Sequence, residues 1–254
     1  MPSIRPVWIL VPLLLGVPAG LQHATAQSDP APRPDRIQPE VSLNFALGFP
    51  TGEFQDNIDD PGFGGSLYGG FQIGQSPVVI GLDLGFLVYG RSQQTVPFSQ
   101  TIGPAVQVDV VTTNSIVQPH LTARLQPQDG MFRPYLAGFV GFKYLFTETD
   151  VRDDDRRRGQ EPIASTTNFD DFAFSGGAAA GMNIRLYRAP IEKALRDVSL
   201  HLGVQYLYGQ EAEYLAEGGI EDVNENGRID DEELDIRRSQ TTLIQPQIGV
   251  TVRF

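Results

Sequence analysis

Hydrophobic and polar residues alternate along much of the chain, and the clearest example is its last stretch, LIQPQIGVTVRF (243–254). Every second residue there is apolar, and Gln, Gly, Thr or Arg stands between. Side chains of a β-strand point alternately to its two faces, so we expect a strand with one hydrophobic and one polar face. The apolar positions are Ile244, Pro246, Ile248, Val250, Val252 and Phe254.

Seven earlier segments show the same period of two, which predicts eight strands in all. We expect them at residues 40–49, 63–74, 78–89, about 107–125, 133–147, 172–186, 198–208 and 243–254. The sixth segment contains the run of Gly and Ala from Gly176 to Gly181, which a helix could also accommodate. Its glycines and the need for an even number of strands favour a strand.

The connections between these strands alternate in length. They are short after the second, fourth and sixth strands and long after the first, third, fifth and seventh, and the longest runs from Gly209 to about Gln240. Short turns on one side and long loops on the other are typical of bacterial outer-membrane barrels. The pattern predicts an all-β fold, an eight-stranded antiparallel up-and-down transmembrane β-barrel over residues 40–254.

The two faces of the strands differ in charge, which bears on the orientation of such a barrel. The main alternative is a soluble lipocalin-like barrel with its apolar faces around a ligand. We favour the membrane arrangement, in which the apolar faces contact lipid and the charges pack inside. The charged or titratable residues expected to point inward are Glu40, Asp83, His120, Arg124, Lys143, Arg185, His201 and Arg253.

Aromatic residues near the strand ends agree with this orientation, because such residues form girdles at the membrane interfaces of barrels. They are Phe49, Phe63, Tyr89, Tyr144, Phe146, Tyr206, Tyr208 and Phe254. Aromatic residues at strand ends are common in any β-protein, so they add modest support.

The first 26 residues have the charged, apolar and small-residue regions of a secretory signal peptide, and cleavage after them would leave Gln27 first. A transmembrane anchor fits less well, because Pro and Gly interrupt an apolar run that is already short. Residues 27–39 are rich in Pro and charge, and we expect a disordered periplasmic lead-in. No Cys is present, which excludes a lipid-anchored lipoprotein and disulfide bonds.

The chain is acidic, with a formal net charge of −12 that becomes −13 when the segment containing Arg5 is removed. This charge argues against a nucleic-acid partner. Acidic outer loops of an exported protein can instead recruit divalent cations.

The last strand resembles the assembly signal of outer-membrane β-barrels in its polar Gln247, Gly249, hydrophobic Val252 and terminal aromatic Phe254. By architecture, residues 40–254 resemble the small outer-membrane barrels of the OmpA, OmpX and OmpW type. This resemblance implies a bacterial outer-membrane location, surroundings of lipid and lipopolysaccharide, and recognition of the last strand by the barrel-assembly machinery. It supports location far better than activity.

Five of the inward charges are expected to form a plug of salt bridges and hydrogen bonds near the periplasmic end. Antiparallel order brings the ends of the first and last strands together, which makes Glu40 and Arg253 neighbours. Arg124 and Arg185 lie close to periplasmic turns, and Asp83 lies slightly higher. An eight-stranded barrel is only wide enough to be filled by side chains, so we favour a structural role over an ion or proton path.

Residues 222–233, DVNENGRIDDEE, match the twelve-residue calcium loop of EF-hands throughout. Calcium prefers six to eight oxygen ligands, and Gly227 permits the sharp turn that brings them together. The expected ligands are Asp222, Asn224, Asn226, the carbonyl of Arg228, Asp230 and the bidentate Glu233.

The flanks of this calcium loop are less complete than those of an EF-hand. Gly218 and Gly219 interrupt any incoming helix, whereas residues 231–236 could form a short outgoing one, so we expect a calcium-loop insertion over 218–236. We expect weak, structural Ca²⁺ binding, with a Kd on the order of 10⁻⁴ to 10⁻³ M as in extracellular modules. The alternative is an acidic surface turn.

Three functions remain open at this point. A structural or surface-interaction role without enzymatic activity is favoured, and a narrow channel for small or hydrophobic molecules is the second hypothesis. An outer-membrane enzyme is third, because neither His120 nor His201 has an evident Ser or Asp partner at a rim and no catalytic motif occurs.

Overall fold

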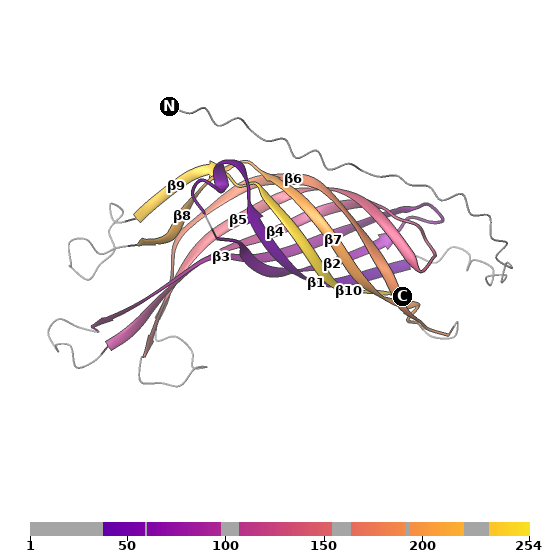
Figure 1. The fold of residues 1–254 in the computed structure, drawn as a ribbon, viewed down its shortest axis with the longest axis horizontal. Helices are drawn as coiled ribbons and strands as arrows, with labels where there is room; N and C mark the ends of the chain where they lie inside the picture. The colour runs from indigo at the N-terminus through magenta and orange to yellow at the C-terminus, as the bar shows by residue number, and fades with distance from the viewer. Residues whose placement is uncertain (1–37, 59, 98–106, 154–163, 191–193, 221–233) are drawn as a thin grey trace, which may run out of the picture. The chain divides into compact units, whose positions relative to one another are not determined.

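The computed structural model describes residues 38–58, 60–97, 107–153, 164–190, 194–220 and 234–254. Eight of the strands in these residues form a closed barrel, and the other two form a separate two-stranded sheet (Figure 1). The barrel strands are β1 (Gln38–Pro50), β2 (Gly62–Gln72), β3 (Val78–Pro97), β4 (Gln107–Leu125), β5 (Phe132–Asp153), β6 (Ala164–Arg188), β7 (Asp197–Gly209) and β10 (Leu243–Arg253). The small sheet contains β8 (Glu211–Ile220) and β9 (Leu234–Gln240).

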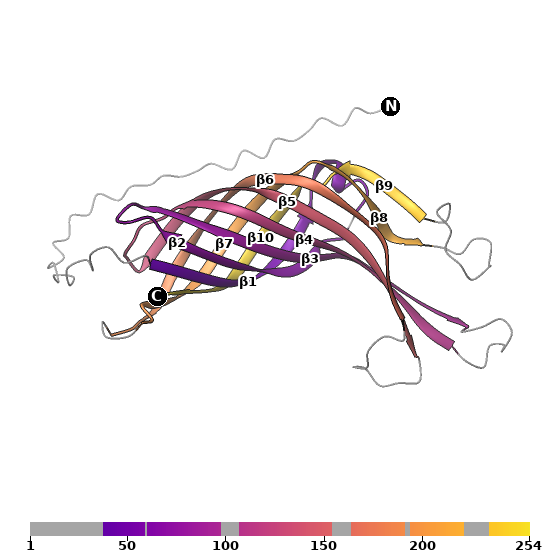
Figure 2. The same cartoon turned by 180° about the vertical axis from the view of Figure 1, so that it is seen from behind.

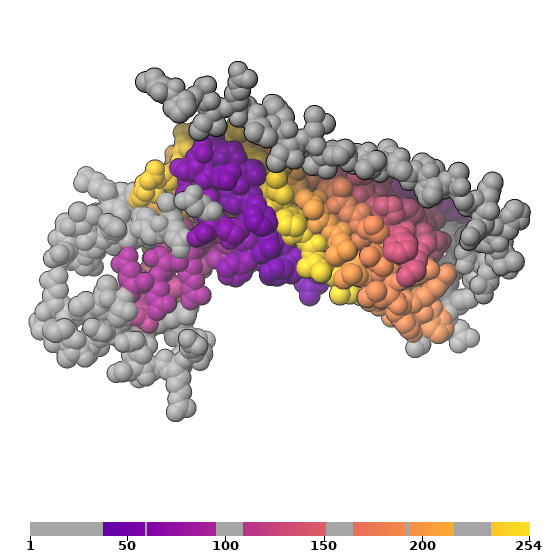
Figure 3. Space-filling view, viewed as in Figure 1, coloured from indigo at the N-terminus to yellow at the C-terminus, as the bar shows by residue number. Residues whose placement is uncertain are grey.

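The barrel closes by pairing of β1 with β10, and every neighbouring pair of strands is antiparallel. Paired residues followed once around the ring lead from Phe49 back to Pro39, ten residues earlier on the same strand. This stagger tilts the strands, and an eight-stranded barrel leaves an interior that side chains can fill. On the surface, the closing seam between β1 and β10 is continuous (Figure 3).

The outer surface of the barrel carries an apolar belt. On β1 the outward residues Val41 to Phe49 are all exposed hydrophobic side chains, and the residues between them are buried. About ten residues of a strand tilted by about 40° rise about 25 Å, which is the height of the lipid-facing band of outer-membrane barrels. The predicted transmembrane barrel is therefore confirmed, and the lipocalin-like alternative is wrong because the apolar faces point outward.

Most of the predicted girdle residues lie on the outward surface, where Phe49, Phe63 and Phe254 are exposed. Tyr89 is an exception, since it points inward and is only 3% exposed. The register of β3 shifts between Val88 and Gly90, where both Tyr89 and Gly90 are buried.

Four strands extend well beyond the ring. The extensions of β3, β5 and β6 lie where the sequence predicted long loops, whereas β4 has the predicted bounds. β3 and β4 continue as a hairpin to Pro97 and from Gln107, and β5 and β6 continue to Asp153 and from Ala164 (Figure 2). These extensions are rich in Thr and Val, whose β-branched side chains favour strands. Cross-strand contacts such as Thr112 Oγ1 with Thr149 Oγ1, 3.2 Å apart, add to their pairing. The first strand also begins earlier than predicted, at Gln38.

The predicted loop from Gly209 to Gln240 contains the antiparallel hairpin of β8 and β9. β8 packs against β3, β4, β5 and β6, and β9 packs against the short 3₁₀-helix η1 (Gly52–Phe54). The expectation of a short helix at 231–236 is wrong for its described part, because β9 begins at Leu234. Among the described residues, no helix is long and apolar enough to cross a membrane.

Candidate functional site

The inside of the barrel is the region where the predicted chemistry gathers, and its periplasmic end is closed by a cluster of charged side chains. We call this cluster the periplasmic plug, and its charged members are Glu40, Arg124, Arg133, Asp197 and Arg253. All five are at most 6% exposed. They come from β1, β4, β5, β7 and β10, so the plug joins five strands across the lumen.

One half of the plug is built around Arg124. Its guanidinium lies 3.3 Å from Glu40 and stacks between the rings of Tyr68 and Tyr135, at 4.2 and 4.3 Å from their centroids. Such cation–π contacts are strongest where water is excluded. Glu40 also accepts a hydrogen bond of 2.8 Å from Gln126 Nε2, so both of its oxygens have partners.

The other half is built around Asp197, which accepts hydrogen bonds from two guanidinium nitrogens of Arg133, at 3.3 and 2.9 Å. Arg253 Nη1 lies 3.7 Å from the same carboxylate, and Arg253 Nε lies 4.0 Å from Glu40. Arg253 therefore links the two halves. Breaking a buried pair by removing one partner typically costs about 3–5 kcal/mol, because a charge is left without compensation.

The structure brings together three of the five predicted network residues, Glu40, Arg124 and Arg253. Asp83 is buried but lies higher, where its Oδ2 accepts a 3.0 Å hydrogen bond from Gln205. Arg185 is half-buried and forms no ion pair with the described residues, and a β-bulge follows it on β6. Its place in the network was therefore wrong.

Sequence reasoning missed Arg133 and Asp197, although the alternation contained the signal. Arg133 has the same parity on β5 as the inward Lys143, and Asp197 has the same parity on β7 as the inward His201. The alternation identifies the face of each strand, but not the partners that a ring of eight strands brings across its interior.

The middle of the lumen contains mainly amides, hydroxyls and the two histidines. His120 Nε2 lies 3.1 Å from Ser175 Oγ, and His201 contacts Tyr135 at 3.2 Å and Asn183 at 3.1 Å. Sequence reasoning did not find the His120–Ser175 pair, which lies inside the lumen and not at a rim. Both His120 and Ser175 are at most 5% exposed.

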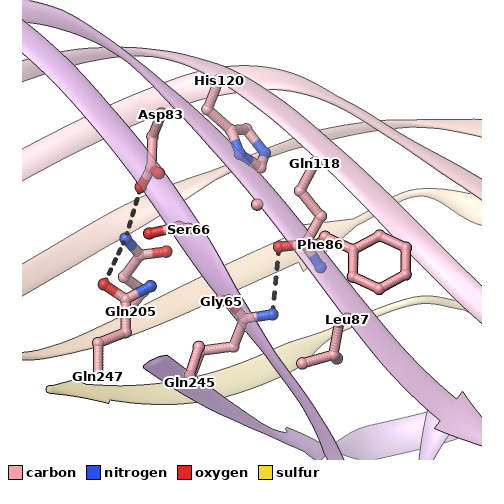
Figure 4. Close-up of a pocket in the computed structure, with 12 residues that line it drawn as sticks. Gly65, Ser66, Asp83, Phe86, Leu87, Gln118, His120, Gln205, Gln245 and Gln247 are labelled. Carbon is pink, nitrogen blue, oxygen red and sulfur yellow. Dashed lines mark hydrogen bonds between the residues drawn. The ribbon is translucent and has the colours of Figure 1, made fainter. Parts of the chain in front are cut away.

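Next to His120 lies a polar cavity of about 10 Å³ (Figure 4). Its walls include side chains from β2, β3, β4, β7 and β10. Gln205 donates hydrogen bonds to Asp83 and to Gln247, and Gln245 donates one to Gln118. These hydrogen bonds connect β3 and β4 with β7 and β10 across the lumen.

The outer mouth of the barrel is filled by apolar and aromatic side chains, which we call the mouth cluster. Its members from the barrel wall include Leu87, Tyr89, Ile116, Leu145, Leu207 and Leu243, and those from the loops are Phe54, Ile58, Ala212 and Tyr214. The ring of Tyr214 packs edge-on against Phe54 at 5.1 Å and against Tyr89 at 6.3 Å. The β8–β9 hairpin and the first loop thus cover the lumen together.

Polar contacts fix this hairpin to the barrel. Asn114 Nδ2 donates to the carbonyl of Leu215 at 3.0 Å, and Asp171 Oδ2 accepts from the amide of Glu213 at 2.8 Å. The fully buried Lys143 donates to the carbonyl of Thr241 at the base of the hairpin.

On the hairpin itself, burial raises the pKa of the Tyr214 phenol, whose oxygen lies 2.7 Å from Ser239 Oγ. A phenol in this position is neutral over the physiological pH range.

The four residues of the predicted assembly signal lie at the end of the chain on and directly after β10, which pairs with β1 on one side and β7 on the other. Gln247 points inward, whereas Phe254 is exposed at the end of the strand. Gly249 lies against β1, where a Cβ would be 2.2 Å from the carbonyl oxygen of Leu43. The signal is therefore part of the closed wall in the folded barrel.

The predicted calcium ligands, Asp222 to Glu233, lie outside the described residues. Within the described residues, no group of three or more His, Asp or Glu side chains could hold a metal ion.

No protein-family model matches the chain, and no curated protein matches it by sequence. Solved structures that are similar to it include Neisserial surface protein A, at 11% identity over 85% of this chain and 95% of that one (TM-score 0.36). Ail, the attachment invasion locus protein of Yersinia pestis, is 12% identical over 87% and 100% of the two chains (0.33). A major outer membrane protein from Thermus thermophilus is 13% identical over 85% and 99% (0.36).

The protein's own geometry supports its location. A closed barrel with an apolar belt about 25 Å high and polar residues inside fits a bacterial outer membrane.

Proposed function

We propose that this protein is a non-conducting outer-membrane surface protein. Its barrel anchors the outer ends of β3 to β6 and the β8–β9 hairpin, which have a structural role or contact other molecules. The observation that supports this most is the filled lumen. Charged pairs occupy its periplasmic end, amides and histidines its middle, and the mouth cluster its outer end. A path for ions or small molecules would need a continuous opening.

Planar bilayers with the purified barrel test this proposal. We expect no ion conductance from the wild type, and none from Glu40→Gln or Arg253→Gln, because side chains continue to fill the lumen above these positions. A porin of an established open-pore type serves as the positive control for insertion. Steady single-channel currents from the wild type would reject the proposal and favour the narrow channel.

The outer extensions of β3 to β6 are the part best suited to contacts outside the membrane. At the ends of the membrane segments that lead into these extensions, on the outward face of β5 and β6, Tyr144 packs against Phe146 at 5.3 Å and Phe172 at 4.7 Å between ring centroids. Aromatic residues at this height suit the interface with lipopolysaccharide, because their rings bury apolar area next to polar headgroups.

We also propose that the protein has no enzymatic activity. The His120–Ser175 pair supports this, because both side chains are buried inside the lumen among the described residues. For assembly, we propose that the barrel-assembly machinery reads the last strand before closure, since both edges of β10 are paired afterwards.

Finally, we propose weak structural Ca²⁺ binding at Asp222 to Glu233. The match to the calcium-loop pattern supports it, and so does the pairing of Ile220 with Leu234, which holds the two ends of this segment together. Joining the ends in advance lowers the conformational entropy that the loop loses on binding. The flanking elements are strands, so the site would be a calcium loop on a β-hairpin and not a helix–loop–helix.

Calorimetry of the folded barrel with CaCl₂ tests the calcium proposal. We expect a binding heat with a Kd on the order of 10⁻⁴ to 10⁻³ M. Asp222→Ala should abolish it, whereas Asp235→Ala, on β9 outside the twelve positions, should leave it unchanged. Equal heats for both variants would indicate nonspecific binding to an acidic surface.

A further inference from the structure

The outer extensions of β3 to β6 form a four-stranded sheet that has two open edges among the described residues. β3 pairs with β2 only as far as Val88, so residues 90–97 are paired on the β4 side alone. β6 pairs with β7 only from Ser175 onward, so residues 164–174 are paired with a barrel strand on the β5 side alone. Such an edge presents backbone N–H and C=O groups to which another strand can pair.

The membrane-proximal part of the β6 edge is already occupied. The amide of Gln210 donates to the carbonyl of Phe174, and the carboxylate of Asp171 accepts from the amides of Phe172 and Glu213. Farther out, the side chains of residues 165–167 are all exposed. The extension bends away from the β8–β9 hairpin (Figure 1, Figure 2). The open part of this edge is therefore the stretch 164–170.

The two edges match in height and in direction. Paired positions followed across the sheet link Arg91 to Thr167 and Gln94 to Ala164. β3 leaves the membrane toward the outside, whereas β6 returns to it. In two copies inserted the same way into one membrane, β3 of one copy and β6 of the next are therefore antiparallel, as all neighbouring strands of the barrel are. Pairing of like edges in one membrane would be parallel.

The edges also carry opposite charges. Arg91 on β3 and Asp170 on β6 are exposed, and neither forms an ion pair among the described residues. Arg91 is aligned across the sheet with Glu148, and Asp170 is paired with Phe146, two residues away on β5. The two charges therefore lie on the same face of the sheet. Opposite charges on neighbouring strands stabilise their pairing, and like charges oppose it.

We propose that the β3 edge of one copy pairs with the β6 edge of a second copy in the same membrane, with Arg91 of one next to Asp170 of the other. The inference rests on the proposed role of the outer extensions as a contact surface, and it names their partner. Because the two edges differ, the contact is head to tail, and repeated contacts build rings or open rows.

Cross-linking of single-cysteine variants tests this arrangement, since the chain has no cysteine of its own. Gln93→Cys lies on the β3 edge and Ser165→Cys on the β6 edge, and both positions are exposed. The two variants carry different tags, are co-expressed in one outer membrane and are treated with a short bismaleimide. We expect the mixture to give severalfold more cross-linked dimer than either variant alone, because like edges do not meet.

Chance collisions are measured by a second mixture, of Gln93→Cys with Arg238→Cys on the exposed hairpin. We expect little cross-linking there. Equal yields in all combinations would overturn the proposal in favour of crowding, and so would the absence of dimers from the Gln93→Cys and Ser165→Cys mixture.

Charge reversal provides the second test. Arg91→Glu in the Gln93→Cys copy should lower the yield of the mixture severalfold, and Asp170→Lys in the Ser165→Cys copy should restore it. The fast-migrating band of unboiled protein shows that each variant still closes into a barrel. A yield that Arg91→Glu leaves unchanged would reject the proposed pairing of these edges. Single-channel currents from the wild type would instead reject the non-conducting role and leave these yields as they are, so the two failures are distinguishable.

Discussion

At the scale of single residues, the periplasmic plug shows how an interior without bulk water holds five charges. Each carboxylate contacts two arginines, and Arg124 is additionally enclosed by two tyrosine rings. Each buried charge is compensated by its neighbours in the plug and not by water. Removing one of these charges should therefore cost more stability than removing a charge from a surface ion pair.

Asp197→Asn tests this difference. We expect the free energy of unfolding to fall by about 3–5 kcal/mol, because Arg133 loses its carboxylate inside the barrel. The control is Asp129→Asn, whose partner Arg196 lies at the same end of the barrel but whose own side chain is 56% exposed. That change should cost about 0–1 kcal/mol. Reversible unfolding followed by far-ultraviolet circular dichroism measures both, and similar losses would contradict the buried character of the plug.

At the scale of elements, the β8–β9 hairpin depends on the buried Tyr214. Burial raises the pKa of the phenol in the docked state, so docking is favoured while the phenol is neutral. This stabilisation is fully present below the ordinary tyrosine pKa of about 10, and it is lost as the pH rises through the raised value.

We therefore expect the hairpin to loosen above about pH 10 in the wild type. In Tyr214→Phe, docking should be weaker by about 1 kcal/mol, through loss of the Ser239 contact, but independent of this titration. A spin label on Arg238→Cys reports docking cleanly, since the chain has no other cysteine. Tyr208→Phe, on the exposed belt, is the control, and identical pH profiles for all three proteins would disprove the coupling.

At the scale of the whole molecule, closure depends on the fit between β1 and β10. A Cβ on Gly249 would lie 2.2 Å from the carbonyl oxygen of Leu43 and 2.3 Å from Asn44 Oδ1, so the two strands approach too closely for a side chain. Closure is also what removes the exposed strand edges that a membrane does not tolerate.

Gly249→Ala should therefore reduce the fraction of protein that closes into the barrel. We expect unboiled wild-type protein to migrate faster on a gel than boiled protein, and the fast band to decrease severalfold in the variant. Gly69→Ala should keep the wild-type pattern, because nothing lies within 4 Å of a Cβ at this outward position of β2. A fast band of equal intensity in Gly249→Ala would show that the seam tolerates a methyl group.

Much of this architecture was predictable because each strand of a membrane barrel faces lipid on one side and the polar lumen on the other. Its residues therefore alternate between apolar and polar. The alternation identified all eight barrel strands, the outward belt and the inward positions of Glu40, Asp83 and Arg253. It matched the length of β4 but missed the length of β3, β5 and β6, because strands outside the membrane have polar residues on both faces. Their pairing depends on cross-strand partners such as Thr112 and Thr149.

By itself, the sequence determined the fold class, the number of barrel strands and the face to which each residue of those strands points, since alternation is a local property of the chain. Only the tertiary structure decided which inward residues meet. Arg133 reaches Asp197 over 64 positions, and Lys143 reaches the carbonyl of Thr241 over 98. Such contacts follow from the stagger of the ring and from how the loops fold over its mouth. The stagger and the loop arrangement both depend on packing between segments that are distant in the sequence. A local pattern of residues does not contain this information.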